Sequence, residues 1–289
     1  MQKVEVWIQA SRPRTLITSI SPVLIGTLIA AKEAPFKFST LLFTLLTAVA
    51  IQIGTNLAND YFDFIKGADT SERKGPVRVT QAGLVSPSEI RRAFILVFSL
   101  AALLGLFLIW EGGALFALLL AVSIALGLLY TGGRYSLAYL GIGDIFVLLF
   151  FGPIATSGTY LLQTHHFSLD ALYAGIGPGM LAWAILMVNN LRDVNEDRAA
   201  GKKTLCVRAG AEIGKLLYFA ALFSAILTPL IWRQEHPFTL LASLIFFPAM
   251  FMAARLLKDD SPGMFNTLLK QTAGLLLLYT LLFSIGWII

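Results

Sequence analysis

One row of polar side chains closes an apolar stretch of this sequence. In the segment NLANDYFD, which follows LLFTLLTAVAIQIGT, the side chains Asn56, Asn59, Asp60 and Asp63 are spaced i, i+3, i+4 and i+7. On an α-helix these positions share one face. Two carboxylates and two amides that face one way in an apolar setting must be paired, coordinated to a metal ion or in contact with water. We call these four residues the first row.

A second row repeats the pattern later in the chain. In VNNLRDVNEDRAAGKKTL, Asn189, Asp193 and Asp197 are spaced i, i+4 and i+8, and Asn190 precedes Asp193 by three residues. A basic, glycine-containing loop follows each row, KGADTSERKGPVR after the first and RAAGKKTL after the second. The chain therefore makes the same chemical arrangement twice, each time at the polar end of an apolar segment.

The two rows suit the binding of a diphosphate together with Mg²⁺. Mg²⁺ prefers oxygen ligands and joins carboxylates to phosphates while it keeps several waters. Two facing rows would hold more than one Mg²⁺, and Lys and Arg of the loops would bind the remaining phosphate oxygens. Diphosphate whose charge is withdrawn by metal is a good leaving group. A substrate with a diphosphate head and a long hydrocarbon tail would then give an allylic carbocation, which requires a chamber that excludes water.

The composition places these rows in a membrane protein. The 289 residues are 57% hydrophobic and 13% charged, with a mean hydropathy of +0.76, whereas soluble domains are about 45–50% apolar and about 25% charged. We expect an all-α polytopic protein in which residues 1–289 form one domain of nine transmembrane helices around a central cavity with a cytoplasmic loop cap. Each crossing needs about 20 apolar residues, and the predicted spans lie at about 15–32, 38–58, 92–110, 113–131, 138–162, 169–190, 214–232, 237–257 and 270–289.

Two of these spans contain helix-breaking residues. These are Gly152-Pro153 in the fifth span and the Gly175–Gly179 segment in the sixth, and they predict kinks beside a cavity.

The basic residues separate the two sides of the predicted bundle. Of the 22 basic residues, all fall on one side except Lys32, Lys37 and Arg233. By the positive-inside rule, the N-terminus, both rows and their loops face the cytoplasm and the C-terminus faces outward. We expect this orientation in the cell inner (plasma) membrane. The net charge of +5 comes from these loops, and no nucleic-acid partner is expected because no soluble module with stacking aromatics accompanies it.

The two rows also carry a resemblance to a known family. The stretches NDYFDFIKGAD and NNLRDVNEDRAAGKKTL resemble the UbiA-type membrane prenyltransferases, most closely the 1,4-dihydroxy-2-naphthoate polyprenyltransferase branch of menaquinone biosynthesis. Supporting stretches are SRPRTL, KGPVRVTQAGLVSP and YTGGRYSLAYLGIGDIFVLLFFG. The resemblance covers about residues 8–212, and the last three predicted spans match only as hydrophobic helices. Where the family commonly has a third acid in its first motif, this chain has Gly67, and Asp69 follows two residues later as either a metal ligand or a lid residue.

The resemblance implies a magnesium-dependent enzyme and assigns roles to both rows. Mg²⁺ would be coordinated by Asp60, Asp63, Asp193 and Asp197. These carboxylates would be oriented, or the phosphate contacted, by Asn56, Asn59, Asn189 and Asn190. Each basic residue of the loops either binds diphosphate or only sets topology, and the expected diphosphate ligands are Lys66, Arg73, Arg78, Lys202 and Lys203.

Five further residues are candidates for the site. Tyr130 and Arg134 have the Tyr-x-x-x-basic spacing of a family pair near the diphosphate, where the family more often has Lys, and Tyr130 is alternatively an interfacial aromatic. Arg14, and less directly Arg12, either reaches the pocket from the first helix or anchors to lipid head groups. Asp144 follows GIG inside the fifth predicted span and either lies near the aromatic substrate or is the partner of a structural donor.

These features predict transfer of a polyprenyl chain from an all-trans polyprenyl diphosphate to 1,4-dihydroxy-2-naphthoate. Diphosphate and CO₂ would be lost and demethylmenaquinol formed, with membrane lipid as the surrounding partner. The nearest alternatives keep the enzyme and change the acceptor to 1,4-dihydroxy-6-naphthoate, homogentisate, 4-hydroxybenzoate or haem. An alternative of another class is a membrane transporter with an intramembrane cation site, for which acids near the bilayer midplane are expected.

Overall fold

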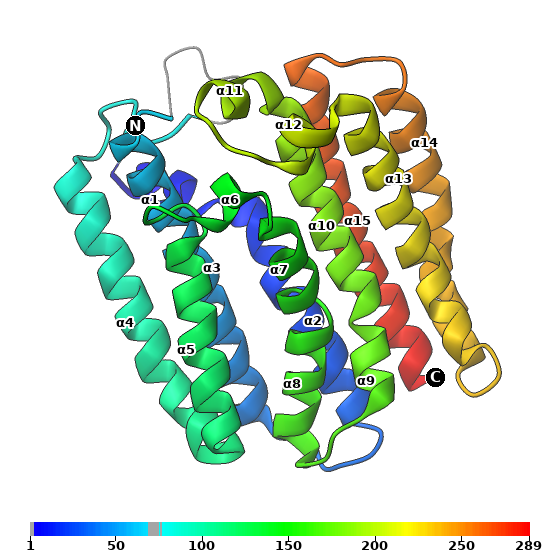
Figure 1. The fold of residues 1–289 in the computed structure, drawn as a ribbon. Helices are drawn as coiled ribbons and strands as arrows, with labels where there is room; N and C mark the ends of the chain where they lie inside the picture. The colour runs from blue at the N-terminus through cyan, green and yellow to red at the C-terminus, as the bar shows by residue number, and fades with distance from the viewer. Residues whose placement is uncertain (1–2, 69–74, 76) are drawn as a thin grey trace.

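The computed structural model describes residues 3–68, 75 and 77–289, and every regular element in these ranges is a helix (Figure 1). The first half of the chain forms α1 Lys3–Ser11, α2 Pro13–Ala30, α3 Phe38–Ile65, α4 Pro87–Gly112, α5 Ala114–Leu129, α6 Leu137–Leu140, α7 Gly143–Phe150 and α8 Pro153–Thr164. The second half forms α9 Leu169–Ala174, α10 Ile176–Arg192, α11 Val194–Ala199, α12 Leu205–Ala209, α13 Ala211–Leu227, the 3₁₀ helices η1 Thr228–Trp232 and η2 Pro237–Ile245, α14 Phe246–Leu256 and α15 Pro262–Ile288.

The predicted membrane bundle is confirmed. In the described residues, eight helical segments are long and apolar enough to cross a membrane, several of them joined from two consecutive helices. The remaining predicted span corresponds to α5, which is apolar but has only 16 residues, about 24 Å of helix. Nine crossings therefore hold as an approximate count.

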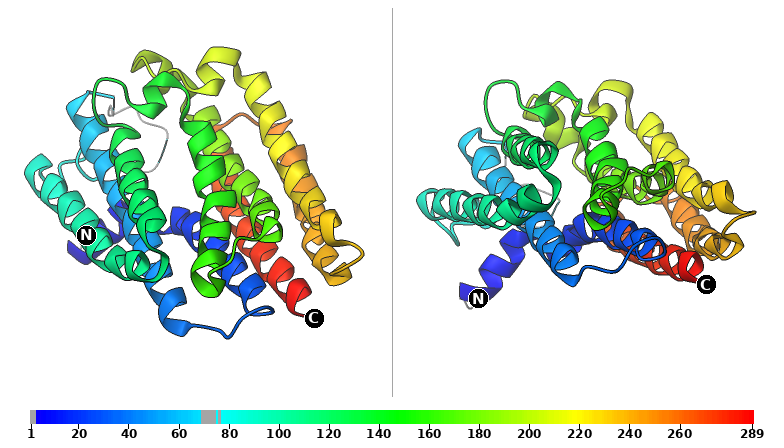
Figure 2. Two further views of the ribbon diagram at one scale, coloured as in Figure 1. Left: turned by 60° about the horizontal axis from the view of Figure 1, so that its bottom comes forward. Right: turned by 90° about the horizontal axis from the view of Figure 1, so that it is seen from below.

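The bundle places both rows at the same end. The first row lies on the last turns of α3, and the second row runs from the end of α10 into α11. The short helices α1, α6, α11 and α12 gather at this end, and the two termini lie at opposite ends of the bundle (Figure 1). Seen from below, α4 lies at one side of the molecule and α13 and α14 lie at the other (Figure 2).

The predicted helix breaks occur where two spans cross closely. α7 gives way to α8 at Gly152, and α9 gives way to α10 at Gly175. A Cβ added at Gly152 would lie 2.4 Å from the carbonyl oxygen of Gly175, and one added at Gly175 would lie 2.5 Å from Cα of Pro153. The glycines thus allow backbone-to-backbone contact, which is how helices commonly pack in a membrane.

A second close approach gives a stability prediction. A Cβ at Gly286 of α15 would lie 2.0 Å from the carbonyl oxygen of Phe238, whereas a Cβ at Gly274 of the same helix would meet nothing within 4 Å. We expect Gly286→Ala to destabilise the protein by about 1–3 kcal/mol through overpacking. Gly274→Ala is the matched control and should be neutral or stabilising by up to about 1 kcal/mol. Thermal unfolding midpoints in detergent test this, and equal midpoints for the two variants would contradict it.

Candidate active site

Both rows open into one cavity of about 550 Å³ at the end of the bundle where the short helices gather. Its walls come from α1, α2, α3, α10, α11, α15 and the segments between them. From the two rows, the cavity is lined by Asn59, Asp60, Asp63, Asn189, Asn190, Asp193 and Asp197. The two acidic helix ends are about 130 residues apart in the chain, and they meet at one cavity as expected.

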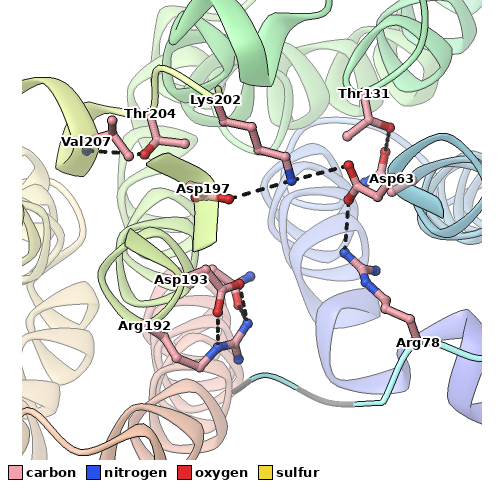
Figure 3. Close-up of polar contacts among 11 residues, drawn as sticks. Asp63, Arg78, Thr131, Arg192, Asp193, Asp197, Lys202, Thr204 and Val207 are labelled. Atoms are coloured by element: carbon pink, nitrogen blue, oxygen red, sulfur yellow. Dashed lines mark hydrogen bonds and ion pairs between the residues drawn. The ribbon is translucent and has the colours of Figure 1, made fainter. Parts of the chain in front are cut away.

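Lys202 joins the two rows directly. Its Nζ lies 3.2 Å from Oδ1 of Asp63 in the first row and 3.6 Å from Oδ1 of Asp197 in the second. Figure 3 shows the side chain extended between the two carboxylates. The glycine before it, Gly201, has φ +74°, a conformation that favours glycine. This turn reverses the chain after α11, and the backbone N–H of Lys202 donates to the carbonyl oxygen of Asp197.

Asp63 is the most enclosed carboxylate of the site. It is 1% exposed, and its Oδ2 accepts a hydrogen bond from Nη2 of Arg78 at 3.3 Å. Together with Lys202, this arginine brings two cations to one buried acid. A buried anion requires such compensation, and a diphosphate would offer both cations an alternative set of oxygens.

Asp60 holds a loop over the cavity. Its Oδ2 and Oδ1 accept hydrogen bonds from the backbone N–H groups of Val79 and Thr80, each at 3.2 Å. Gln9 of α1 donates to the carbonyl oxygen of Val77 at 3.1 Å, which fixes the same loop from the other side. The described part of the loop after the first row is thus attached to the first row itself. Each carboxylate oxygen of Asp60 has a further lone pair for another ligand.

Arg192 is a site residue that sequence reasoning missed. Its Nε and Nη2 donate to Oδ1 and Oδ2 of Asp193 at 2.6 and 2.8 Å, a bidentate pair seen in Figure 3. Nη2 also donates to Oδ1 of Asn189 at 2.9 Å, and Nη1 donates to Oδ1 of Asn266 at 3.0 Å. Arg192 therefore orients two members of the second row and ties them to α15. Its position three residues after Asn189 and one before Asp193 was the available signal.

Tyr130 separates the polar cavity from a second, apolar one. It lines both the 550 Å³ cavity and a cavity of about 210 Å³ between α2, α3, α5, α7 and α8. The second cavity is walled mostly by apolar side chains, including Phe116, Phe146 and Phe150. A molecule with a polar head and a hydrocarbon tail would meet a matching surface on each side of this tyrosine.

Asp144 is buried in the wall of the polar cavity. It lies in the first turn of α7 and is 7% exposed. Its Oδ1 accepts a hydrogen bond from Nε1 of Trp183 at 2.9 Å. The structural donor that the sequence left as one alternative is thus present. Because Asp144 also faces the cavity, its side chain is both fixed and available to a ligand.

Four expected ligands lie outside the walls of the polar cavity. Asn56 donates to the carbonyl oxygen of Ser11 at 2.9 Å and to Oγ1 of Thr15 at 3.0 Å, so it joins α3 to the α1–α2 junction. Lys66 donates to the carbonyl oxygens of Thr131 and Gly133, and burial lowers the pKa of its ammonium while the Asp63 charge raises it. The other two expected ligands, Arg134 and Lys203, have exposed side chains.

The remaining expected residues divide into two groups. Arg14 and Arg12 both line the polar cavity, from the start of α2 and from the residue before it. Arg12 has φ 51°, an uncommon backbone conformation for a residue with a side chain. Asn59 also lines the cavity, and its Oδ1 accepts the hydroxyl of Thr131 at 2.8 Å. The predicted loop ligands Asp69 and Arg73 lie outside the described residues.

The donor set of the cavity fits Mg²⁺ in its chemistry. Carboxylate and amide oxygens from both rows line one space, and Mg²⁺ takes oxygen ligands together with water and phosphate. Among the described residues, no three acidic, histidine or cysteine side chains already converge as a metal site. The carboxylates instead pair with Lys202, Arg78 and Arg192. A metal would therefore have to take over carboxylates that protein cations now neutralise.

Comparison with known proteins agrees with this site. The chain matches the UbiA prenyltransferase family over residues 19–287. It is 36% identical to the 1,4-dihydroxy-2-naphthoate octaprenyltransferase of Haemophilus influenzae, over 100% of this chain and 97% of the relative. It is 34% identical to the enzyme of the same name from Escherichia coli, over 99% of this chain and 96% of the relative.

The fold agrees as well. A solved structure of a UbiA homolog from Archaeoglobus fulgidus bound to DMAPP and Mg²⁺ is similar to this chain, with a TM-score of 0.58 and 14% identity over 96% of this chain and 99% of the other. This likeness concerns the fold, while the family match and the curated relatives concern the sequence. The protein is thus a multi-pass membrane protein and a transferase of alkyl groups that belongs to the UbiA prenyltransferase family.

Proposed function

We propose that the protein transfers a polyprenyl chain from an all-trans polyprenyl diphosphate to 1,4-dihydroxy-2-naphthoate, which gives demethylmenaquinol, CO₂ and diphosphate. The observation that carries the proposal is the meeting, at Tyr130, of a cavity lined by both acidic rows with an apolar cavity. The choice of acceptor is supported by the names of relatives at 34–36% identity over nearly the whole chain. In this proposal residues 1–289 act as one domain.

The two rows would bind the diphosphate end of the donor. Asp63, Asp193 and Asp197 would hold Mg²⁺, with Asp60 and the loop residue Asp69 as further ligands. Bound Mg²⁺ supplies charge that makes diphosphate a good leaving group. Lys202 and Arg78, which now contact Asp63, would turn to phosphate oxygens, and Arg14 would add charge from the rim of the cavity. Asn59, Asn189 and Asn190 would orient the carboxylates or contact phosphate.

The acceptor would bind between the rows and Asp144. Trp183 fixes one oxygen of Asp144, which leaves Oδ2 to accept a hydrogen bond from a ring hydroxyl. As the bond between the allylic carbon and the diphosphate oxygen breaks, a bond forms from that carbon to the ring carbon that carries the carboxylate. The electron pair of the departing carboxylate returns to the ring as CO₂ leaves. No strong base is required, and the described residues that line the polar cavity include no histidine.

The proposal includes a location in the cell. The rows and the N-terminus would face the cytoplasm in the inner membrane, because the loops at this end carry nearly all of the basic residues. The termini lie at opposite ends of the bundle, as an odd number of crossings requires (Figure 1). The diphosphate head and the acceptor would thus meet the rows at the cytoplasmic side of the membrane.

One assay tests the function. Purified protein with Mg²⁺ is given an all-trans polyprenyl diphosphate and, separately, 1,4-dihydroxy-2-naphthoate, 1,4-dihydroxy-6-naphthoate, homogentisate, 4-hydroxybenzoate and haem, and products are identified by mass. We expect efficient transfer with the first acceptor and release of diphosphate and CO₂. Preference for another acceptor would contradict the proposed substrate. If no acceptor led to release of diphosphate, the proposed prenyl transfer itself would be contradicted.

Arg192 provides a prediction for a residue that acts through Asp193. We expect Arg192→Ala to lower kcat/KM about 10–100-fold and to raise the Mg²⁺ concentration needed for half-maximal activity, because groups that orient metal ligands typically have effects of this size. Arg192→Lys should recover only part of the loss, since lysine lacks the bidentate fork. Arg198→Ala, at an exposed arginine of α11, is the control. Wild-type Mg²⁺ dependence in Arg192→Ala would contradict the prediction.

A further inference from the structure

A groove between α14 and α15 lies apart from both cavities described above. It encloses about 340 Å³ and is lined by Pro248, Phe251, Met252, Arg255, Gln271, Gly274, Leu275 and Leu278. On α15 the polar cavity is lined instead by Asn266, Leu269 and Ala273. The spacing of these two sets places them on different faces of the helix. The groove is thus on the outside of the bundle, where lipid surrounds a membrane protein.

The groove opens because the two helical segments separate along their length. Near the C-terminus of α15, Gly286 lies against the backbone of Phe238 in η2, with no room for a Cβ. Three turns earlier in α15, Gly274 is exposed and has nothing within 4 Å of an added Cβ. The helical segments are therefore farther apart at Gly274 than at Gly286, so the groove is wider toward the end of the bundle that carries the acidic rows. Phe251 and Leu278, 74% and 39% exposed, form apolar walls beside it.

Basic side chains surround the wide end of this groove. Arg255 lines the groove from the last turn of α14 and is exposed. Lys270 is also exposed and lies one turn before Gly274, on the same face of α15. Lys258 follows two residues beyond the end of α14. None of these three side chains has an acidic partner within 4.0 Å among residues 3–68, 75 and 77–289.

The acids of the same loop have other partners. Asp260 lies 3.0 Å from Nζ of Lys215, which also contacts Glu212. Oδ1 of Asp259 accepts the backbone N–H of Ser261 at 2.7 Å, just before α15 begins. Arg255, Lys258 and Lys270 therefore remain outside these ion pairs and are available to an external anion. An anion that approaches from the membrane surface would be attracted to them.

An orphaned acceptor lies in the same groove. Oε1 of Gln271 is buried and has no hydrogen-bond partner among the described residues. An unpaired buried amide oxygen is costly, and a turn of the Gln271 side chain into the groove would let a ligand hydroxyl satisfy it. The groove thus combines an apolar channel, three exposed basic side chains around its wide end and a buried amide oxygen without a donor.

We propose that this groove binds one anionic phospholipid from the leaflet that covers the end of the bundle with the acidic rows. Its phosphate lies beside Arg255 and Lys270, and an acyl chain runs over Gly274 between Phe251 and Leu278. A head group with a hydroxyl, as in phosphatidylglycerol, donates to Oε1 of Gln271 once this side chain turns into the groove. The proposal does not depend on the proposed reaction, because no residue of the polar cavity takes part.

Native mass spectrometry of the purified full-length protein tests the proposal. The protein is titrated with phosphatidylglycerol and, separately, with phosphatidylcholine of the same acyl chains. We expect one phosphatidylglycerol to bind in preference to phosphatidylcholine. Arg255→Gln/Lys270→Gln should weaken phosphatidylglycerol binding roughly thirtyfold, since each basic side chain near an anionic lipid surface contributes a factor of about five. Gly274→Leu, which keeps every charge and whose Cβ would have nothing within 4 Å, should displace the bound lipid.

The controls separate this site from general attraction of lipid to basic loops. Arg91→Gln/Arg92→Gln removes two exposed basic residues at the same end of the bundle, on α4, and should leave the high-affinity lipid in place. Equal binding of the two lipids by the wild-type protein would overturn the proposal. So would equal weakening by the α4 double variant and the groove double variant, or full binding by Gly274→Leu.

Discussion

Asp63→Asn is expected to lower the kcat/KM of prenyl transfer by roughly 10²–10³-fold, the usual cost of removing one charge-stabilising group from an active site. Asparagine keeps the shape of the side chain but removes the charge that Lys202 and Arg78 now share. It also removes a ligand proposed for Mg²⁺. The measurement is initial rate of diphosphate release by protein in membranes or detergent, at saturating Mg²⁺.

Loss of folding must be separated from loss of chemistry. Asp63→Asn leaves two buried cations with less compensation, and an unpaired buried charge is destabilising by about 3–5 kcal/mol. The charge-balanced variant Asp63→Asn/Lys202→Gln should recover much of the unfolding temperature and none of the activity. Glu212→Gln, which alters an exposed acid paired with Lys215, is a control with normal activity. Near-normal turnover in Asp63→Asn would remove Asp63 from the proposed site.

Exhaustive removal of divalent cations is expected to reduce prenyl transfer to background, with recovery on addition of Mg²⁺ or Mn²⁺. The reason is that a diphosphate must depart from a cavity already rich in carboxylates, and its charge must be neutralised in the transition state. The unfolding temperature of the protein without substrate should change little. Lys202, Arg78 and Arg192 pair with Asp63, Asp193 and Asp197, so these carboxylates have cationic partners within the protein itself.

Two measurements on the same sample keep these effects distinct. Activity and thermal unfolding are followed before and after chelation, with and without prenyl diphosphate. We expect the donor to raise the unfolding temperature only when Mg²⁺ is present, because a ligand stabilises in proportion to its binding. A rate that is unchanged after chelation would contradict the metal requirement. If the donor raised the unfolding temperature equally with and without Mg²⁺, the proposal that metal and diphosphate bind at one site would be contradicted.

The meeting of the two rows was predictable because it follows from local rules. Apolar length fixed the spans, helical spacing fixed which side chains share a face, and the basic loops fixed which ends lie together. Asn59, Asp63, Asp193 and Asp197 accordingly line one cavity. None of these inferences required knowledge of how a loop is folded.

The individual ligands were less predictable because their directions depend on loops and on contacts between helices. Lys202 and Lys203 are adjacent in sequence, yet the turn at Gly201 directs the first between the rows and leaves the second exposed. Asn56 shares a helical face with Asp60 and Asp63 but is taken up by the α1–α2 junction. Arg192 lies next to Asp193 in the sequence, but only the structure shows that its guanidinium binds that carboxylate and also reaches Asn266 of α15.

The position of Tyr130 between the two cavities bears on which prenyl donors the protein would accept. A diphosphate bound to the rows, as proposed, would place the start of its hydrocarbon chain at this boundary, whatever length follows. Under the proposed function, the place of the scissile bond would thus be set by the head of the donor and not by the length of its chain. Donors that differ only at the far end would then present the same scissile bond at the same place.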